Sequence, residues 1–233
     1  MRKTGEKLMQ NTLDKMANIT VLAPHIDDEI IGAGGSIAKH IDFGNAVRVI
    51  YVHSGDTHDE VQVRESEAAR VADFLGIKDS HFLRQRPTSI SNKSVEEIVG
   101  LLRKQSTDFL YAPHLDDGDT EHVAVSQLAH RLLWLTNGEY FKEQNGQGRL
   151  KGLFLYEVHR PISQVHYLED ITKYENKKIA AIRLFESQVA RVRYDLSAVH
   201  LNRYRGITTE VAPSVESFQI AGARNFFELF RSR

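Results

Sequence analysis

Two widely separated segments of the chain combine histidine with carboxylates directly after an apolar run. The first is Ala23-Pro24-His25-Ile26-Asp27-Asp28-Glu29, and the second runs from residue 113 to residue 122. Together they offer two histidines and one aspartate, His25, Asp28 and His122, which could hold a divalent metal ion and leave positions open for water and substrate. That ligand set is typical of a catalytic zinc site rather than of a closed structural one.

A zinc ion held in this way would favour hydrolysis of an amide. The ion lowers the pKa of its bound water to about 7 and polarises a carbonyl oxygen, the two effects that amide hydrolysis needs near neutral pH. Asp27, next to Asp28, is then the candidate general base for that water. A helix dipole also favours acidic residues in the first turn, so helix capping alone would account for the aspartates, although not for His25.

Alternating strand and helix patterns position these segments. Apolar runs predict strands at 19–23, 47–52, 81–83, 109–112 and 153–158. Helical periodicity predicts helices at 30–43, 60–75, 94–102, 123–135, 174–192 and 195–204. This order predicts an α/β, Rossmann-like fold with a mostly parallel sheet and helices on both faces. Because ligands bind beyond the carboxyl ends of the strands in such folds, we expect the metal site there.

Small residues and a single tryptophan add detail to the predicted helices. The helix at 30–43 includes Gly32, Gly34 and Gly35, which offer a small-residue face for close packing on the sheet. Gly76 and Gly206 are predicted to end the helices before them. Trp134 falls on the helical pattern of residues 123–135 and is expected in the core.

Composition limits the kind of site and of partner. The chain has 233 residues, no cysteine and a formal net charge of -1. Without cysteine, any metal must be held by His, Asp or Glu, and disulfides and cysteine nucleophiles are excluded. The near-zero charge provides no overall field that would attract nucleic acid or an anionic membrane, so neither is expected as a partner.

The arrangement of the chain follows from its length and its apolar runs. We expect residues 1–18 to form an N-terminal extension with a ragged amphipathic helix, and residues 19–233 to form one domain. The first twenty residues lack the apolar core of a secretory signal, and no run reaches transmembrane length, so a cytoplasmic location is expected. The sequence leaves a homo-oligomer open.

The first segment, followed by Gly32-Ala33-Gly34-Gly35, resembles the opening motif of the PIG-L/LmbE-type family of zinc-dependent N-acetylglucosamine deacetylases. Further segments resemble other motifs of that family, the last three of them more weakly: His53-Ser54-Gly55-Asp56, Arg64 with Glu67, Pro113 to His122, Lys177-Lys178, Ser187-Gln188 and Asn202-Arg203-Tyr204-Arg205-Gly206. The resemblance covers roughly residues 19 to 220.

The resemblance implies a role for each residue of the site. His25, Asp28 and His122 would bind one Zn²⁺ per chain, with other divalent metals left open, and Asp27 would be the general base. Arg64 would line the substrate pocket. The implied reaction removes an N-acetyl or similar N-acyl group from a small amino sugar or a glycoconjugate, by attack of metal-activated water on the amide.

The chain departs from the family pattern at Asp119, where the second loop commonly has histidine. An ionised carboxylate there would oppose the charge of an oxyanion, unless its neighbours keep it protonated or it contacts another partner, such as a substrate hydroxyl. Our hypothesis is that His114, His53 or His159 supplies the missing donor. The departure also leaves an alternative function open: a sugar-binding protein that retains the metal but has little or no turnover.

Other interpretations of the same residues remain. The glycines at 32–35 suggest a dinucleotide-binding enzyme, but they lie beyond the turn after the first strand, where such a fingerprint begins. His25-x-Asp27 with His122 also matches the two-histidine, one-carboxylate triad of non-haem iron oxygenases. By residue type alone, Asp116 and Asp117 are expected to be solvated loop residues, and Arg64 a surface ion-pair partner.

Overall fold

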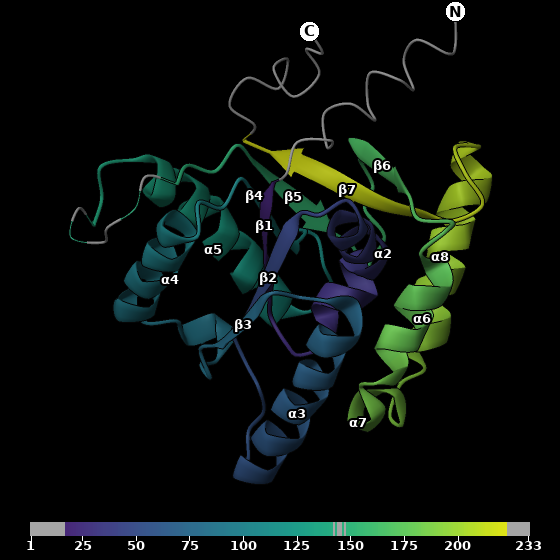
Figure 1. Ribbon diagram of the computed structural model, residues 1–233, viewed down its shortest axis with the longest axis horizontal. Helices are drawn as coiled ribbons and strands as arrows, with labels where there is room; N and C mark the ends of the chain where they lie inside the picture. Colours follow the sequence, from purple (N-terminus) through teal and green to yellow (C-terminus); the bar gives the residue numbers. More distant parts are fainter. Residues whose placement is uncertain (1–16, 142, 144–145, 147, 223–233) are drawn as a thin grey trace, which may run out of the picture.

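A sheet with helices on both faces forms the centre of the molecule (Figure 1). The structure, a computed structural model, describes residues 17–141, 143, 146 and 148–222. The strands are β1 (Asn18–Ala23), β2 (Ala46–Tyr51), β3 (Asp79–Phe82), β4 (Phe109–Pro113), β5 (Gly152–Tyr156), β6 (Tyr167–Asp170) and β7 (Val215–Ala221). Their order is β3-β2-β1-β4-β5-β7-β6. Strands β1 to β5 are parallel, and β7 pairs antiparallel with β5 and β6.

Helices cover the sheet in two layers, one on each face. They are α2 (Asp28–Asp42), α3 (His58–Leu75), α4 (Asn92–Lys104), α5 (Thr120–Asn137), α6 (Glu175–Arg183), α7 (Glu186–Val189) and α8 (Tyr194–Thr209), with a 3₁₀ turn at Pro87–Ser89. Helices α2, α3, α6 and α8 pack on one face, and α4 and α5 on the other (Figure 1). The predicted α/β, Rossmann-like fold with a mostly parallel sheet is confirmed.

The central strand explains why the first apolar run is continuous. Val21 packs into the core on the α2 side, and its neighbour Leu22 packs into the core on the α5 side. Because successive side chains point to opposite faces and both faces are covered, residues 19–23 of β1 are all buried. They are apolar except for Thr20, whose hydroxyl is hydrogen-bonded to that of Thr107 at 2.8 Å. The strand therefore ends where the polar residues of the site begin.

Close packing of α2 depends on its glycines. A Cβ at Gly32 would collide with the ring of Tyr156 in β5, so the predicted packing on the sheet holds there. Gly34 instead faces Lys178 in α6, and Gly35 faces Ile171 in the segment before α6. The helix also departs from helical geometry at Ala33, where φ is -134°.

A buried ion pair fastens α2 to the C-terminal part of the sheet. Glu216 in β7 accepts hydrogen bonds from the backbone N–H groups of Gly35 and Ser36, both at 2.8 Å, and from Lys178 Nζ at 2.7 Å. Lys178 also donates to Asn202 Oδ1 at 2.9 Å. These buried charges are paired and hydrogen-bonded, so they connect α2, α6, α8 and β7.

Several sequence predictions for the C-terminal half are wrong. The helix predicted at 174–192 is broken into α6 and α7, because Phe185 leaves helical geometry and is fully buried. Strands β6 and β7 were not predicted, because buried polar residues such as Glu216 and Ser217 interrupt the apolar pattern of β7. Trp134 is 61% exposed rather than in the core, and the centroid of its ring lies 4.4 Å from that of Tyr140.

The two glycines predicted to end helices differ in their roles. Gly76 ends α3 in the left-handed conformation, with φ of 87°, as predicted. Gly206 does not end α8, which continues to Thr209 before Glu210 adopts a φ of 56°. A Cβ at Gly206 would collide with the carbonyl oxygen of Ala212, so glycine is needed there for a close backbone approach.

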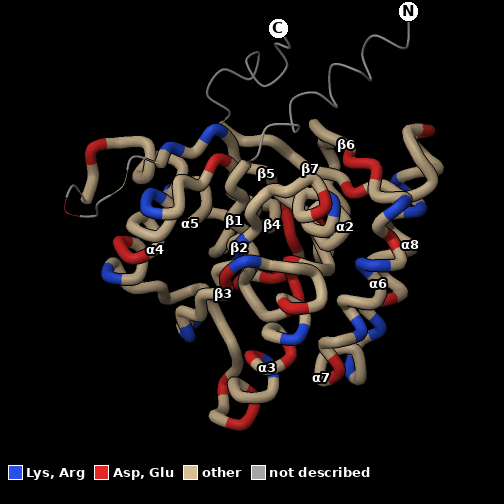
Figure 2. The backbone as a smooth tube through the Cα atoms, viewed as in Figure 1, with Lys and Arg blue, Asp and Glu red and all other residues tan. Residues whose placement is uncertain are grey.

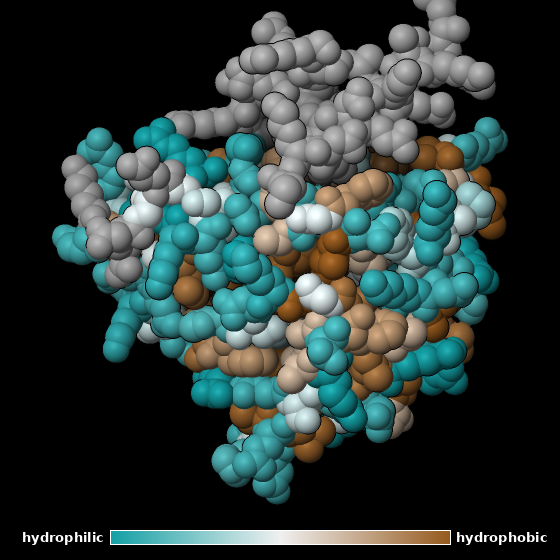
Figure 3. Space-filling view, viewed as in Figure 1, coloured by the Kyte–Doolittle hydropathy of each residue, from teal (hydrophilic) through white to brown (hydrophobic). Residues whose placement is uncertain are grey.

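The surface carries both signs of charge. Figure 2 shows acidic and basic positions interspersed along the helices, consistent with the net charge of -1. Hydrophilic side chains cover much of the face seen in Figure 3, with hydrophobic residues between them. None of the helices that the structure describes is long and apolar enough to cross a membrane. The helix expected within residues 1–18 falls mostly on residues 1–16, outside the described residues, and the division at residue 19 remains a prediction.

Candidate metal centre

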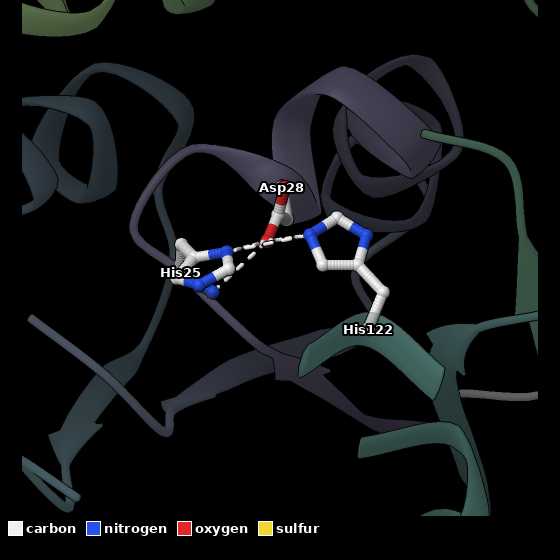
Figure 4. A group of neighbouring side chains, drawn as sticks. All are labelled: His25, Asp28 and His122. Atoms are coloured by element: carbon white, nitrogen blue, oxygen red, sulfur yellow. Dashed lines mark hydrogen bonds and ion pairs between the residues drawn. The ribbon is translucent and has the colours of Figure 1, made fainter. Parts of the chain in front are cut away.

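The two histidine-bearing segments meet at the carboxyl ends of β1 and β4, which are neighbours in the sheet. Strand order reverses between them, since the chain runs outward from β1 through β2 to β3 and then returns to β4. Such a switch point is where open α/β sheets bind ligands. His25 follows β1, Asp28 begins α2, and His122 lies in the first turn of α5, as Figure 4 shows.

The three predicted ligands converge on one point. His25 Nδ1 and His122 Nε2 each lie 3.2 Å from Asp28 Oδ2, and the two nitrogens lie 3.3 Å apart (Figure 4). An ion at the usual zinc–nitrogen distance of about 2.0–2.1 Å, with tetrahedral angles, separates its ligand atoms by about 3.3 Å. The spacing and the donor types of these residues therefore fit a zinc-sized ion.

Each imidazole also has a carboxylate near its second nitrogen. Glu121 Oε2 lies 2.7 Å from His25 Nε2, and Asp117 Oδ1 lies 3.5 Å from His122 Nδ1. Such outer carboxylates fix the tautomer and the orientation of metal-binding histidines. Asp117 is buried, so the expectation that it is a solvated loop residue is wrong, whereas Asp116 is exposed as expected.

The backbone of the second loop explains the burial of Asp117. Its carboxylate accepts hydrogen bonds from the backbone N–H of Asp119 at 3.0 Å and from that of His159 at 3.2 Å. It therefore ties the loop after β4 to the loop after β5. Residue type and spacing gave no signal for this arrangement, because His159 is distant in the sequence.

Charges within the triad support metal binding. Burial would raise the pKa of Asp28, but the neighbouring charges and hydrogen bonds of His122 and His25 hold it well below its usual range. Burial would lower the pKa of His122, but the carboxylates of Asp28 and Asp117 raise it to about 11. The site thus stabilises positive charge between the ligands, and a metal ion would take the place of the proton on His122.

Asp27 differs from its neighbour Asp28 in environment and in backbone. Burial, together with the charges of Asp28 and Glu29, raises the pKa of Asp27 well above its usual value. Its φ of 124° is a region that residues other than glycine rarely adopt, and such strain persists where the surrounding structure holds it. Glu29 contributes by accepting the backbone N–H of Asp27 at 3.2 Å. Asp27 therefore differs from Asp28 in both respects, and its role as general base remains a prediction.

Glu29 and Tyr51 form a buried polar pair behind Asp27 that sequence patterns did not reveal. The Tyr51 hydroxyl donates to Glu29 Oε1 at 2.8 Å. Burial raises the pKa of Glu29 to about 8. Glu29 therefore supports the strained turn at Asp27 from within the fold.

Arg64 and Asp119, the predicted substrate contacts, flank the site. The side chain of Arg64 is 15% exposed, and its Nη2 atom lies 3.9 Å from Glu60 Oε1. The charge of Arg64 lowers the pKa of Asp27, against the larger effect of burial. Asp119 caps α5, since its Oδ1 accepts the backbone N–H of Glu121 at 2.7 Å. Helix capping therefore explains why an aspartate is found at this position. A contact with substrate remains a prediction for both residues.

The three histidines considered as replacement donors lie in different surroundings. His114 is buried and both ring nitrogens are engaged, with the Arg160 carbonyl at 2.8 Å and the Asp116 N–H at 3.3 Å. The ring of His53 lies 6.0 Å from that of His25. The ring of His159 stacks on His122 at 4.8 Å, and its nitrogens make no hydrogen bond among the described residues. His53 and His159 thus border the triad, whereas His114 is held by Asp116 of its own loop and by the Arg160 carbonyl of the loop after β5.

Tyr194 is a further residue of the site that sequence patterns missed. It begins α8, and its ring lies 6.3 Å from that of His159. Burial and the carboxylates of Asp27, Asp28 and Asp119 raise its pKa. Only the folding of α8 against the loop after β5 brings this tyrosine to the site, so no local pattern could indicate it.

Comparison with known proteins relates this arrangement to known enzymes. Residues 20–133 match the family "PIG-L: GlcNAc-PI de-N-acetylase". A diacetylchitobiose deacetylase of Thermococcus kodakarensis is 26% identical over 191 residues, which cover 73% of this chain and 69% of that protein. A 4-oxalmesaconate hydratase of Pseudomonas putida is 24% identical over 198 residues, which cover 76% of each protein.

The fold also matches a solved structure. The N,N'-diacetylchitobiose deacetylase from Pyrococcus horikoshii, complexed with its inhibitor MPG, aligns with a TM-score of 0.78 and 23% sequence identity. The alignment covers 98% of this chain and 94% of that chain. The two proteins therefore share their fold over nearly their full lengths.

Proposed function

Because this chain belongs, through residues 20–133, to the PIG-L family, we propose that it is a metal-dependent hydrolase. Its substrate would be an N-acetylated, or similarly N-acylated, amino sugar or glycoconjugate. The observation that carries the proposal is the triangle of His25, Asp28 and His122, whose facing atoms lie 3.2–3.3 Å apart. Two nitrogen atoms and one oxygen atom at this spacing suit the coordination of zinc.

Zinc, when bound, would supply a water of lowered pKa and would polarise the amide carbonyl. The residues of the chain then have separate tasks. Glu121 and Asp117 keep the two imidazoles in orientation. Asp27, whose raised pKa favours holding a proton, takes the proton of the attacking water and can return it to the leaving amine.

The leaving amine and the carbonyl oxygen need further donors, because Asp119 is a carboxylate. We assign this role to His159, which stacks on His122 and has free ring nitrogens among the described residues. Arg64 and Asp119 would contact hydroxyls of the sugar. On this proposal His114 has no direct role, since its ring nitrogens are engaged.

Two alternatives use the same metal site. One is a sugar-binding protein with little turnover, favoured by Asp119 in the position of the usual histidine. The other is a hydratase, favoured by the similarity to 4-oxalmesaconate hydratase, whose match covers 76% of this chain. Hydration also needs an activated water and a base, so the triad and Asp27 alone do not distinguish it from hydrolysis.

A single set of assays distinguishes these functions. Purified protein is loaded with zinc, the metal content is measured, and acetate release is followed with N-acetylglucosamine, diacetylchitobiose and GlcNAc-phosphatidylinositol. Loss of absorbance with 4-oxalmesaconate reports hydratase activity in parallel. We expect acetate release that His122→Ala abolishes. Stoichiometric zinc without acetate release would contradict the proposed hydrolase, and turnover of 4-oxalmesaconate would replace it with the hydratase.

A further inference from the structure

The arginines of α3 and of the loop after β3 differ in how far their charge is neutralised. Arg84 makes two hydrogen bonds to Glu65, both at 2.8 Å, and Arg86 donates to Asp56 at 2.5 Å. Arg64 makes no hydrogen bond among the described residues, although its side chain is only 15% exposed. A largely buried side chain that carries five N–H donors therefore lacks partners in this part of the chain.

Arg191, in the turn after α7, also lacks a close partner for its charge. Its side chain is 68% exposed, and its Nη2 atom lies 3.9 Å from Glu60 Oε1, the same distance from that oxygen as Arg64 Nη2. This separation is too long for a hydrogen bond. The other oxygen of Glu60 accepts the backbone N–H of Asp56 at 3.0 Å. Two guanidinium groups thus approach one carboxylate oxygen, and neither is hydrogen-bonded to it.

A buried contact fixes the backbone that carries Arg191 against the helix that carries Arg64. Helices α3 and α7 lie side by side (Figure 1). Glu67 in α3 is 3% exposed and accepts hydrogen bonds from the backbone N–H of Ser187 at 2.8 Å and from its hydroxyl at 2.7 Å. The backbone N–H of Arg191 in turn donates to the Gln188 carbonyl at 2.9 Å. Both arginines are therefore carried by anchored backbone.

The charge of Arg64 also reaches the metal centre. It lowers the pKa of Asp27, the neighbour of the ligand Asp28, against the larger effect of burial. The planar fork of a guanidinium matches the oxygens of a phosphate or a carboxylate, and its five donors leave room for a sugar hydroxyl as well. Arg64 thus acts on the site that a substrate at the triad would occupy.

We propose that Arg64 and Arg191 together bind an anionic group of the substrate, a phosphate or a carboxylate attached to the amino sugar. This inference rests on the proposed function, because it places the amide of an N-acyl sugar at the metal. The anion takes up guanidinium donors that no described residue occupies, and the negative charge of Glu60 opposes its binding. The pair therefore favours a charged sugar over neutral N-acetylglucosamine.

The test measures binding of deacetylated sugars, which requires no turnover. Zinc-loaded full-length protein is titrated calorimetrically with glucosamine, glucosamine 1-phosphate, glucosamine 6-phosphate and muramic acid, which carries a carboxylate. At least one of the three anionic sugars should bind about tenfold more tightly than glucosamine, the effect of a charged hydrogen bond. Its identity distinguishes a phosphate from a carboxylate. The ratio of kcat/KM for its N-acetyl form to that for N-acetylglucosamine is measured on the same preparation.

Substitutions that change the charge in opposite directions test the pair. Arg191→Gln should lower the preference for the anionic sugar about tenfold. Glu60→Gln should increase the affinity for that sugar, because glutamine retains an acceptor for the Asp56 N–H and no longer repels the anion. Arg203→Gln is the matched control, since it removes an exposed arginine that pairs with Glu175 instead, and it should keep the preference.

The outcomes separate the two proposals. Equal or undetectable binding of all four sugars, with acetate release from an N-acetyl sugar, would overturn the anion site alone. A preference that Arg191→Gln leaves unaltered would also overturn it, because the anion then binds elsewhere, such as at the zinc. A preference that depends on Arg191, without hydrolysis of any N-acyl sugar, would overturn the proposed function and leave the anion site.

Discussion

The Nδ1 atom of His25 and the Nε2 atom of His122 lie 3.3 Å apart, although 97 positions separate the two residues in the chain. Two parallel strands bring them together, because β1 and β4 are neighbours and both end at the same edge of the sheet. Asp28 closes the group from the start of α2 at 3.2 Å from each nitrogen. The predictions below follow from this arrangement and from its supporting residues.

Asp27→Asn should keep zinc and lose most of the activity. The substitution removes the proposed general base, and general-base catalysis contributes about 10²- to 10⁴-fold to a rate. Asp27 does not belong to the triangle of ligand atoms, so the zinc content should stay at one per chain. Steady-state kinetics with metal analysis check this. A variant with unchanged kcat would exclude Asp27 as the base.

Glu121→Gln should weaken zinc binding by about 10- to 100-fold, the usual effect of losing an outer carboxylate. Its carboxylate lies 2.7 Å from His25 Nε2 and sets the orientation of that ring. Competition with a chelator measures the affinity. Asp116→Asn, which changes an exposed acid in the same loop, is the matched control and should leave the affinity unchanged. Equal affinities in both variants would show that Glu121 does not orient His25.

Asp119→Ala should lower the free energy of unfolding by about 1 kcal/mol, because it removes the cap of α5. Asp119→Ser retains a capping oxygen and should restore that stability in urea unfolding. If the carboxylate also contacts a sugar hydroxyl, a charged hydrogen bond is lost in Asp119→Ser, and kcat/KM should fall about tenfold. Full activity in the serine variant would reduce Asp119 to a structural role.

His40 should make the protein less stable in acid. Its ring is buried between the Tyr111 hydroxyl at 3.0 Å and Asn45 Nδ2 at 3.2 Å, and burial lowers its pKa from 6.5 to about 4. Below pH 6.5 the unfolded chain takes up a proton that the folded chain does not. The folded state therefore loses stability as the pH falls from 6.5 towards 4, by about 3 kcal/mol in total.

Comparison with His40→Gln isolates this contribution, since the other titrating groups are the same in both proteins. Unfolding free energies at pH 7 and pH 4 should show a smaller loss in the variant, by about 3 kcal/mol. His200→Gln, at an exposed position, should behave like the unaltered protein. An identical loss in His40→Gln would show that His40 takes up its proton at its ordinary pKa in the folded state.

The fold and the convergence of His25, Asp28 and His122 could be predicted because their signals are local or topological. The apolar run of β1 reports burial on both faces, and parallel strands must end at a common edge. Residues such as Asp117 and Tyr194 could not be predicted, because loop backbone and helix packing bring them to the site. Strand β7 could not be predicted either, because the buried charge of Glu216, which is paired with Lys178 of α6, interrupts its apolar pattern.

The central claim is that one ion joins His25, Asp28 and His122. Anomalous diffraction at the zinc edge from crystals of the zinc-loaded protein tests it most directly. We expect a single peak per chain, about 2.0–2.2 Å from His25 Nδ1, Asp28 Oδ2 and His122 Nε2. A peak instead between Asp117, His122 and His159, the other group of residues that could hold a metal within the described part of the chain, would contradict the account.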